Sequence, residues 1–104
     1  MDILGIRKAV RSGRIEWHRH ALERMMERGI TRGMVKKVLV SGELIENYPD
    51  VTPYPSALFL GFRKKEPLHV VAAFDERTEY CFIITAYRPD PEHFEGDYKT
   101  RRVQ

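Results

Sequence analysis

Apolar residues in the first 42 positions recur with the period of an α-helix. Ile3, Ile6 and Val10, for instance, share one helical face. Gly29 stands where a helix can end, because glycine readily adopts a left-handed backbone conformation. Residues 14–18 alternate instead and predict a short strand or an extended link. The pattern predicts three helices, over residues 3–12, residues 20–28 and the segment between Thr31 and Gly42.

The pattern changes after Gly42, where apolar and polar residues begin to alternate with the period of a β-strand. It predicts four strands, over residues 43–48, 56–63, 67–75 and 80–88. The segment 49–55 holds three prolines and is expected to be a loop. Because the links between successive strands are too short for a parallel crossover, we expect antiparallel pairing. From Pro89 onwards the chain is polar, and residues 99–104 are expected to be loose.

This order of elements predicts an α+β fold, in which the N-terminal helices pack on one face of a roughly four-stranded antiparallel sheet. A chain of 104 residues can bury one hydrophobic core but not two. We therefore expect a single domain over residues 1–104. Its parts are a mostly helical region 1–42, an antiparallel sheet 43–88 and a polar C-terminal tail 89–104.

The composition is typical of a globular protein with a mild basic bias. Hydrophobic residues make up 42% of the chain, and the net charge of +3 permits binding to nucleic acid without requiring it. No stretch approaches the roughly 18 consecutive apolar residues of a membrane span, and the N-terminal residues lack the features of a signal peptide. The single cysteine, Cys81, can form no internal disulfide, so we expect a reducing, cytoplasmic setting.

The helix over residues 20–28 carries a basic stripe. His20, Arg24 and Arg28 are spaced four residues apart and therefore lie along one face. Such a stripe offers a titratable imidazole beside two cations, which suits the recognition of a phosphate group. The alternative is a solvated surface, in which Glu23 and Glu27 neutralise the two arginines through ion pairs on the same helix. The spacing alone leaves both interpretations open.

A second candidate is His69, which lies in an otherwise apolar strand. It is either a hydrogen-bonded core residue or part of a site on the open face of the sheet. One strand register places His69 opposite Thr85 and on the same side as Tyr87. A register shifted by one residue places it on the side of Ile84 and Arg88 instead. The turn between the strands lacks a diagnostic Gly or Asn, so both registers stay open.

Two further residues could contact a nucleic acid. Tyr48 adjoins the proline-rich loop, where an exposed aromatic ring can stack on an unpaired base, although packing of the loop against the sheet is the simpler interpretation. Arg102 could contact a phosphate, with a solubilising tail as the alternative.

The pair His18 and His20 lacks the further ligands of a metal site, and no glycine-rich phosphate loop is present. We therefore expect no metal and no other cofactor.

Four blocks of the sequence, in this order, carry a resemblance: His20-Ala21-Leu22-Glu23-Arg24-Met25 with Arg28-Gly29-Ile30, then Gly42-Glu43-Leu44-Ile45-Glu46-Asn47-Tyr48-Pro49, then Pro67-Leu68-His69-Val70-Val71, then Ile83-Ile84-Thr85-Ala86-Tyr87-Arg88-Pro89-Asp90. Together they resemble domain-of-unknown-function family 4258. The resemblance covers roughly residues 14–102, which is nearly the whole chain beyond the first predicted helix.

That family is similar to bacterial toxins of the RelE/ParE and BrnT type. The resemblance implies a small α+β domain, helices before an antiparallel sheet, whose protein partner is a cognate antitoxin. Many such toxins cut RNA without a metal ion, whereas ParE-like members inhibit DNA gyrase. It therefore implies a metal-independent ribonuclease, with RNA, free or bound to a ribosome, as its substrate.

Cleavage of RNA needs a base, an acid and cations that hold the phosphate. We expect His20 or His69 to be the acid or base, Arg24 to hold the phosphate, and Tyr87 to donate a hydrogen bond or a proton. The expected RNA-binding residues are Arg28, Arg88, Arg102 and Tyr48. The alternative is a non-catalytic binding module on the same scaffold, which inhibits a target protein or serves as an adaptor. Convergence of these side chains in the fold would discriminate between the two.

Overall fold

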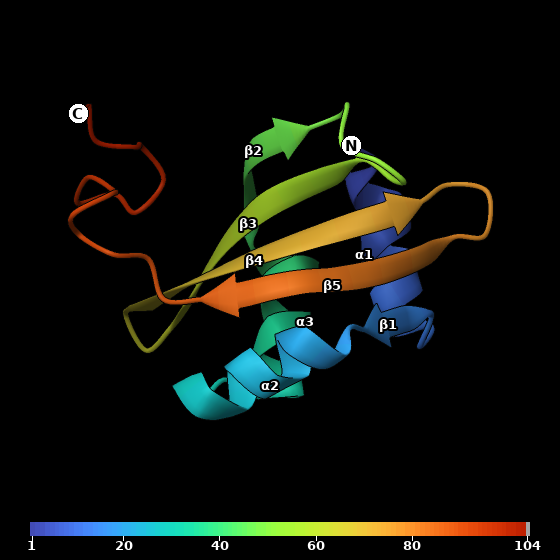
Figure 1. Cartoon of the computed structure of the whole chain (residues 1–104), viewed down its shortest axis with the longest axis horizontal. Helices are drawn as coiled ribbons and strands as arrows, with labels where there is room; N and C mark the ends of the chain where they lie inside the picture. The colour runs from blue at the N-terminus through green and yellow to red at the C-terminus, as the bar shows by residue number, and fades with distance from the viewer. Residues whose placement is uncertain (104) are drawn as a thin grey trace.

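The computed structural model describes residues 1–103, and its helices precede most of its strands (Figure 1). All three predicted helices and all four predicted strands are present, and their ends agree with the predictions to within one residue. The elements are α1 (Ile3–Arg11), β1 (Ile15–Trp17), α2 (Arg19–Arg28), α3 (Arg32–Ser41), β2 (Glu43–Tyr48), β3 (Ser56–Arg63), β4 (Glu66–Asp75) and β5 (Tyr80–Tyr87). None of the helices within residues 1–103 has the length and apolarity needed to cross a membrane.

The sheet is five-stranded and mixed, with the strand order β1-β5-β4-β3-β2. Strands β2 to β5 pair antiparallel with their neighbours, as their short links predicted. The predicted count of about four strands, all antiparallel, is wrong because β1 adds a fifth strand parallel to β5, with Ile15 opposite Cys81. The argument from short links applies only to successive strands, and β1 and β5 are separated by most of the chain.

The helix ends are stabilised by local hydrogen bonds. The Asp2 carboxylate accepts a hydrogen bond of 2.8 Å from the amide of Gly5 at the start of α1. The Thr31 hydroxyl accepts one of 3.1 Å from the amide of Met34 at the start of α3, as expected of an N-cap residue. Gly29 ends α2 with a φ angle of 68°, a left-handed conformation that turns the chain directly into α3.

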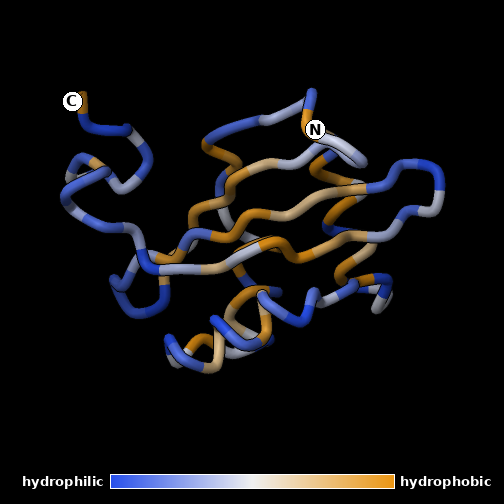
Figure 2. The backbone as a smooth tube through the Cα atoms, in the orientation of Figure 1, coloured by the Kyte–Doolittle hydropathy of each residue, from blue (hydrophilic) through white to orange (hydrophobic). Residues whose placement is uncertain are grey.

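The two faces of the sheet differ. Helices α1 and α3 cover one face, and α2 lies along β5 (Figure 1). Hydrophobic segments run along the central strands and the helices behind them (Figure 2). Alternate residues of β4 enter the core on the helix-covered side, namely Leu68, Val70, Ala72 and Phe74. Burial of one such side chain contributes about 1.5–3 kcal/mol. The intervening residues of β4, including His69, face the other, open side.

Residues 89–103 fold back onto the open face, and we call this segment the strap. It begins where β5 ends and forms a turn in which the amides of His93 and Phe94 both bond to the carbonyl of Asp90. Phe94 and Arg101 form an isolated β-bridge within it. The expectation of a loose end is therefore wrong for residues 99–102, whereas Val103 is 99% exposed and Gln104 lies outside the described residues. The aromatic ring of Phe94 anchors the strap, because only 3% of this residue is exposed.

Candidate functional site

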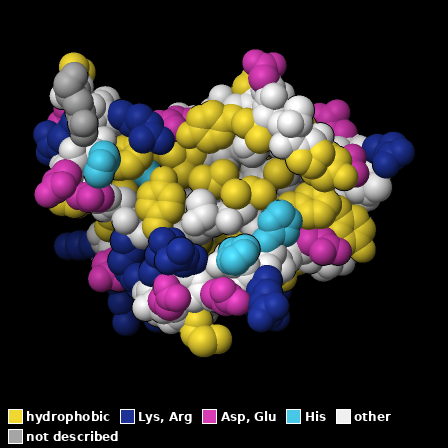
Figure 3. Space-filling view, in the orientation of Figure 1, with side chains coloured by type: hydrophobic (Ala, Val, Ile, Leu, Met, Phe, Trp, Pro, Cys, Tyr) yellow, Lys and Arg dark blue, Asp and Glu magenta, His cyan; other side chains and the backbone are white. Residues whose placement is uncertain are grey.

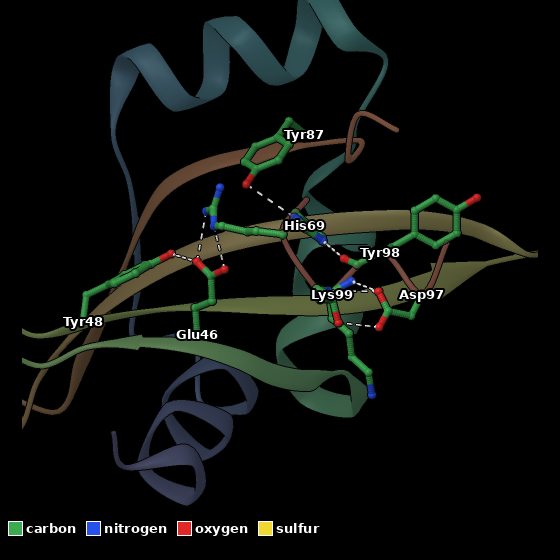
Figure 4. Close-up of polar contacts among 9 residues, drawn as sticks. Glu46, Tyr48, His69, Tyr87, Asp97, Tyr98 and Lys99 are labelled. Carbon is green, nitrogen blue, oxygen red and sulfur yellow. Dashed lines mark hydrogen bonds and ion pairs between the residues drawn. The ribbon is translucent and has the colours of Figure 1, made fainter. Parts of the chain in front are cut away.

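His69 lies at the centre of a polar cluster between the open sheet face and the strap (Figure 4). None of its surface is exposed. Its Nε2 atom lies 2.6 Å from the backbone carbonyl oxygen of Tyr98, and its Nδ1 atom lies 3.4 Å from the hydroxyl of Tyr87. The ring of Phe94 packs edge-on at a centroid distance of 4.7 Å. His69 is thus buried on the side away from the helices, by the strap.

The strand register that brings Tyr87 to His69 matches neither of the two alternatives read from the sequence. Asp75 pairs with Tyr80 at the turn, and a β-bulge then inserts Ile84 as an extra residue in β5. The bulge shifts the pairing by one residue, so that His69 lies directly opposite Tyr87. Of the two arrangements left open, the one with His69 and Tyr87 on the same side is present, but Thr85 lies opposite Val71 rather than His69.

The hydrogen bonds determine the tautomer of His69. A carbonyl oxygen can only accept, so Nε2 carries the hydrogen and donates it to Tyr98, while Nδ1 accepts from the Tyr87 hydroxyl. Burial lowers the pKa of His69, although the bond to Tyr98 and the charge of Glu46 oppose this effect. Burial also raises the pKa of the Tyr87 hydroxyl. Both side chains are therefore held neutral near pH 7.

Glu46 and Tyr48 on β2 complete the cluster. The Glu46 carboxylate accepts two hydrogen bonds from Arg101, of 2.7 Å from Nε and 3.0 Å from Nη2, and a third from the Tyr48 hydroxyl. Burial raises the pKa of Glu46, but the bonds from Arg101 and Tyr48 outweigh it, so the net pKa is lowered. The same carboxylate raises the pKa of the Arg101 guanidinium. Glu46 is therefore an ionised carboxylate close to a neutral imidazole.

Sequence reasoning missed Glu46, Arg101, Phe94 and Tyr98 as members of this cluster. A weak signal existed for Glu46, because it lies two residues before Tyr48 and so faces the same side of a strand. No signal existed for the three strap residues, because their positions depend on how the strap folds back over the sheet.

The basic stripe on α2 lies apart from this cluster. The His20 side chain is 95% exposed, and its Nδ1 atom lies 3.8 Å from Glu23. Arg24 pairs with Glu27 at 3.7 Å, as the ion-pair interpretation of this helix anticipated. Within residues 1–103, neither His20 nor Arg24 forms a hydrogen bond or ion pair with His69 or Tyr87.

Two of the other candidate arginines meet at the end of β5, next to Tyr87. Arg28 donates a 2.9 Å hydrogen bond to the carbonyl of Ala86, and Arg88 donates one of 2.6 Å to the carbonyl of Arg28. Lys and Arg side chains gather where β5 ends beside α2 (Figure 3). Arg102 instead bonds inside the strap, to the carbonyl of Pro91 at 2.6 Å and to Glu95 at 3.0 Å. The structure therefore brings Arg28 and Arg88 together at the end of β5 that carries Tyr87.

Two other side chains that could be reactive, those of Asp75 and Cys81, have structural roles. Asp75 accepts bonds from the amide of Arg77 and the hydroxyl of Thr78, so it stabilises the turn between β4 and β5. Burial raises the pKa of the Cys81 thiol to about 12, so this cysteine is an unreactive core residue. In the described part of the chain, no three His, Cys, Asp or Glu side chains gather as a metal site would require.

Comparison with known proteins gives one match. The model of a family described as "Domain of unknown function (DUF4258)" matches residues 17–88. These residues run from the last residue of β1 to the first residue after β5, so the match includes His69, Tyr87 and Glu46 but ends before the strap. Neither a curated protein nor a solved structure matches the chain.

Proposed function

The chain belongs to the DUF4258 family, and on the basis of its site we propose that it is a toxin-like endoribonuclease that cleaves RNA without a metal ion. The observation that carries this proposal is the grouping of His69, Tyr87 and Glu46 on the open face of the sheet. An imidazole, a phenol and a carboxylate together supply the proton transfers of phosphodiester cleavage. The resemblance to RelE/ParE and BrnT toxins supports the same activity.

In the proposed reaction, the 2′-hydroxyl of a ribose attacks the adjacent phosphorus, and the 5′-oxygen of the next nucleotide leaves. His69 is the base, because its burial favours the neutral ring that can take the proton from the 2′-hydroxyl. Glu46 favours the protonated form of His69 and so stabilises the positive charge that the ring then carries. Tyr87 donates a proton to the leaving 5′-oxygen, and His69 then returns the proton that it accepted to the tyrosinate through the contact between Nδ1 and the Tyr87 oxygen.

The basic residues near the end of β5 supply the cations that the reaction requires. Arg28 bonds to the backbone of Ala86 and Arg88 directly follows Tyr87 in the chain, and a guanidinium can bind two phosphate oxygens at once. Arg24 and His20 on the exposed face of α2 extend this surface toward neighbouring nucleotides. In this proposal the protein acts in the cytoplasm, and a cognate antitoxin is its protein partner.

The proposal is tested with pure full-length protein and messenger RNA, ribosome-free and ribosome-bound, in the presence of EDTA. We expect cleavage that His69→Gln and Tyr87→Phe each slow by about 100-fold or more, because each removes a proton-transfer group. The matched control is His18→Gln, which changes an exposed histidine outside the cluster. Circular dichroism confirms that each variant is folded.

The nuclease proposal would be overturned if RNA stayed intact with the wild-type chain and also with Arg101→Glu and Phe94→Ala, two substitutions in the strap. Equal loss of cleavage in His18→Gln would also count against it, because His18 makes no contact with the cluster in the described structure. Full cleavage in His69→Gln would remove His69 from the mechanism.

One observation favours a second function, that of a non-catalytic binding module. Both ring nitrogens of His69 are already bonded within the protein, as in a structural core histidine. A binding module would inhibit a target protein or act as an adaptor, and it would bind its partner without cleaving RNA. Slowed growth on expression, retained in His69→Gln while RNA stays intact, would support this function over the nuclease.

A further inference from the structure

The strap contacts both of the groups that the proposed reaction uses. The Tyr98 carbonyl accepts the hydrogen on Nε2 of His69, and the Arg101 guanidinium binds the Glu46 carboxylate through two hydrogen bonds. One continuous segment therefore engages the imidazole and the carboxylate together (Figure 4). The strap also lies outside residues 17–88, so the family match contains the site but not its cover.

Few interactions attach the strap to the sheet. Phe94 is the only buried side chain between Asp90 and Val103, and it packs on His69 with Arg101 above its ring at 4.9 Å. Lys99 adds an exposed ion pair with Glu43 at 3.2 Å. Exposed ion pairs of this kind contribute little to stability. The attachment therefore depends mainly on Phe94, Arg101, the bond to His69 and the edge-on contact of Tyr98 with Phe62 on β3, at a centroid distance of 6.3 Å.

The strap also has internal contacts that preserve its own shape. Arg102 pairs with Glu95 at 3.0 Å, and the Thr100 hydroxyl donates a 2.6 Å hydrogen bond to Asp97. None of the strand pairings of the sheet uses a strap residue. The strap can therefore leave the open face as a unit while the sheet stays paired.

We propose that the strap is a releasable cover that keeps the site closed. In the closed state it occupies the surface on which a ribose and its phosphate would contact His69 and Glu46, and its release exposes both groups. A role of the strap in regulating RNA cleavage rests on the proposed function, but release of the strap can be measured without RNA.

Release is measured as the rate at which diethyl pyrocarbonate modifies His69 in the full-length protein, resolved by peptide mass spectrometry. We expect Arg101→Glu and Phe94→Ala to raise this rate by about tenfold or more, because the first repels Glu46 and the second removes the buried anchor. Exposed His20 is the internal reference. Arg77→Glu is the charge-matched control, because Arg77 lies at the β4–β5 turn, away from the strap (Figure 1).

A charge exchange tests the cause of release. In the double variant Glu46→Arg with Arg101→Glu, the ion pair is restored with reversed signs, so protection of His69 should return. His69 that stays protected in both Arg101→Glu and Phe94→Ala would overturn the proposal. A rate that rises equally in Arg77→Glu would also overturn it, because the effect would then not depend on the strap.

Cleavage of an unstructured RNA carrying a fluorophore and a quencher separates the two proposals. Faster cleavage by Arg101→Glu than by the wild type supports both. Exposed His69 with intact RNA supports the releasable cover and overturns the nuclease. If His69 is protected in the wild type but the wild type and Arg101→Glu cleave RNA equally fast, the strap does not restrain the site and the proposal of a cover is overturned.

Discussion

Among single residues, His69 is distinguished by the number of contacts that fix its ring. Tyr98 and Tyr87 bond to its two nitrogens, and Phe94 packs against it edge-on. A ring held in this way has one tautomer and one orientation. His20, by contrast, is exposed on α2 and has only a 3.8 Å ion pair with Glu23. Of the two histidines proposed for proton transfer, His69 is therefore the one that the protein pre-positions.

We predict that His69 titrates below its ordinary pKa of about 6.5, because burial disfavours the charged ring. The charged groups facing it are Glu46, which opposes this shift, and Arg101, which adds to it. Because the unfolded chain then binds the proton more readily than the folded one, the free energy of unfolding falls as the pH drops below about 6.5.

Nuclear magnetic resonance of the imidazole protons measures this pKa, and urea unfolding at a series of pH values measures the stability. The fall in stability should be smaller in His69→Gln, which has no imidazole at this position. A His69 pKa at or above its ordinary value would show that the ring is not desolvated as described.

The sequence could show that His69 faces the side of its strand opposite to Leu68 and Val70, because alternation along a strand is a local property. It could not show that Tyr87 shares that side, because this depends on the register between two strands. It could not show that Glu46 is paired, because the partner, Arg101, is 55 residues away along the chain. The approach of Arg28 to the carbonyl of Ala86 likewise depends on how α2 packs against β5. Pairings between distant segments are properties of the fold rather than of a local pattern.

At the scale of elements, the contact between α3 and β3 depends on a glycine. A Cβ atom added to Gly61 would lie 2.7 Å from the Cγ2 atom of Val38. The added atom would also lie 3.2 Å from the Cβ and 3.3 Å from the Cα atom of Val38, so a change of the Val38 rotamer alone cannot relieve the contact. The absence of a side chain at Gly61 therefore sets how closely α3 approaches the sheet.

We predict that Gly61→Ala destabilises the protein by about 1–3 kcal/mol, because the added methyl group overpacks this contact. The matched control is Gly33→Ala, whose Cβ would meet its nearest neighbour, Thr31, at 3.9 Å. Because alanine favours helix, this control should be neutral or should stabilise α3 by up to about 1 kcal/mol. Urea unfolding of both variants provides the comparison, and equal stabilities would contradict the proposed packing.

The helices and strands themselves could be predicted well, because the helical or alternating spacing of hydrophobic residues can be recognised in a short stretch of sequence. The parallel pairing of β1 with β5 could not, since three residues carry no information about a distant partner. The bulge at Ile84 could not be predicted either, because nothing in β5 marks the extra residue. This bulge determines which residue lies opposite His69, so the geometry of the site depends on a feature that could not be predicted from the sequence.

At the scale of the whole molecule, the strap is joined to the sheet partly by charge. Lys99 pairs with Glu43 and Arg101 pairs with Glu46, and the arginine and lysine side chains are about half exposed. Salt screens exposed pairs much more than buried ones. The attachment of the strap should therefore depend on ionic strength, whereas the core between helices and sheet should not.

We predict that His69 in the wild type is modified faster as ionic strength rises from roughly 0.01 M to roughly 1 M, where the Debye length shortens from about 30 Å to about 3 Å. Phe94→Ala, in which the strap is already released, should show little further change. A wild-type rate that is independent of salt would mean that Arg101 and Lys99 do not contribute to attachment.

A covered site also changes how ligand affinities are to be interpreted. If only a small fraction of molecules has an open face at any moment, the apparent dissociation constant of a ligand equals the intrinsic one divided by that fraction. A compound library screened against the wild-type chain would therefore miss ligands that bind the open face well. The same library screened against Arg101→Glu would recover them, which makes this single substitution a reagent for finding the natural ligand.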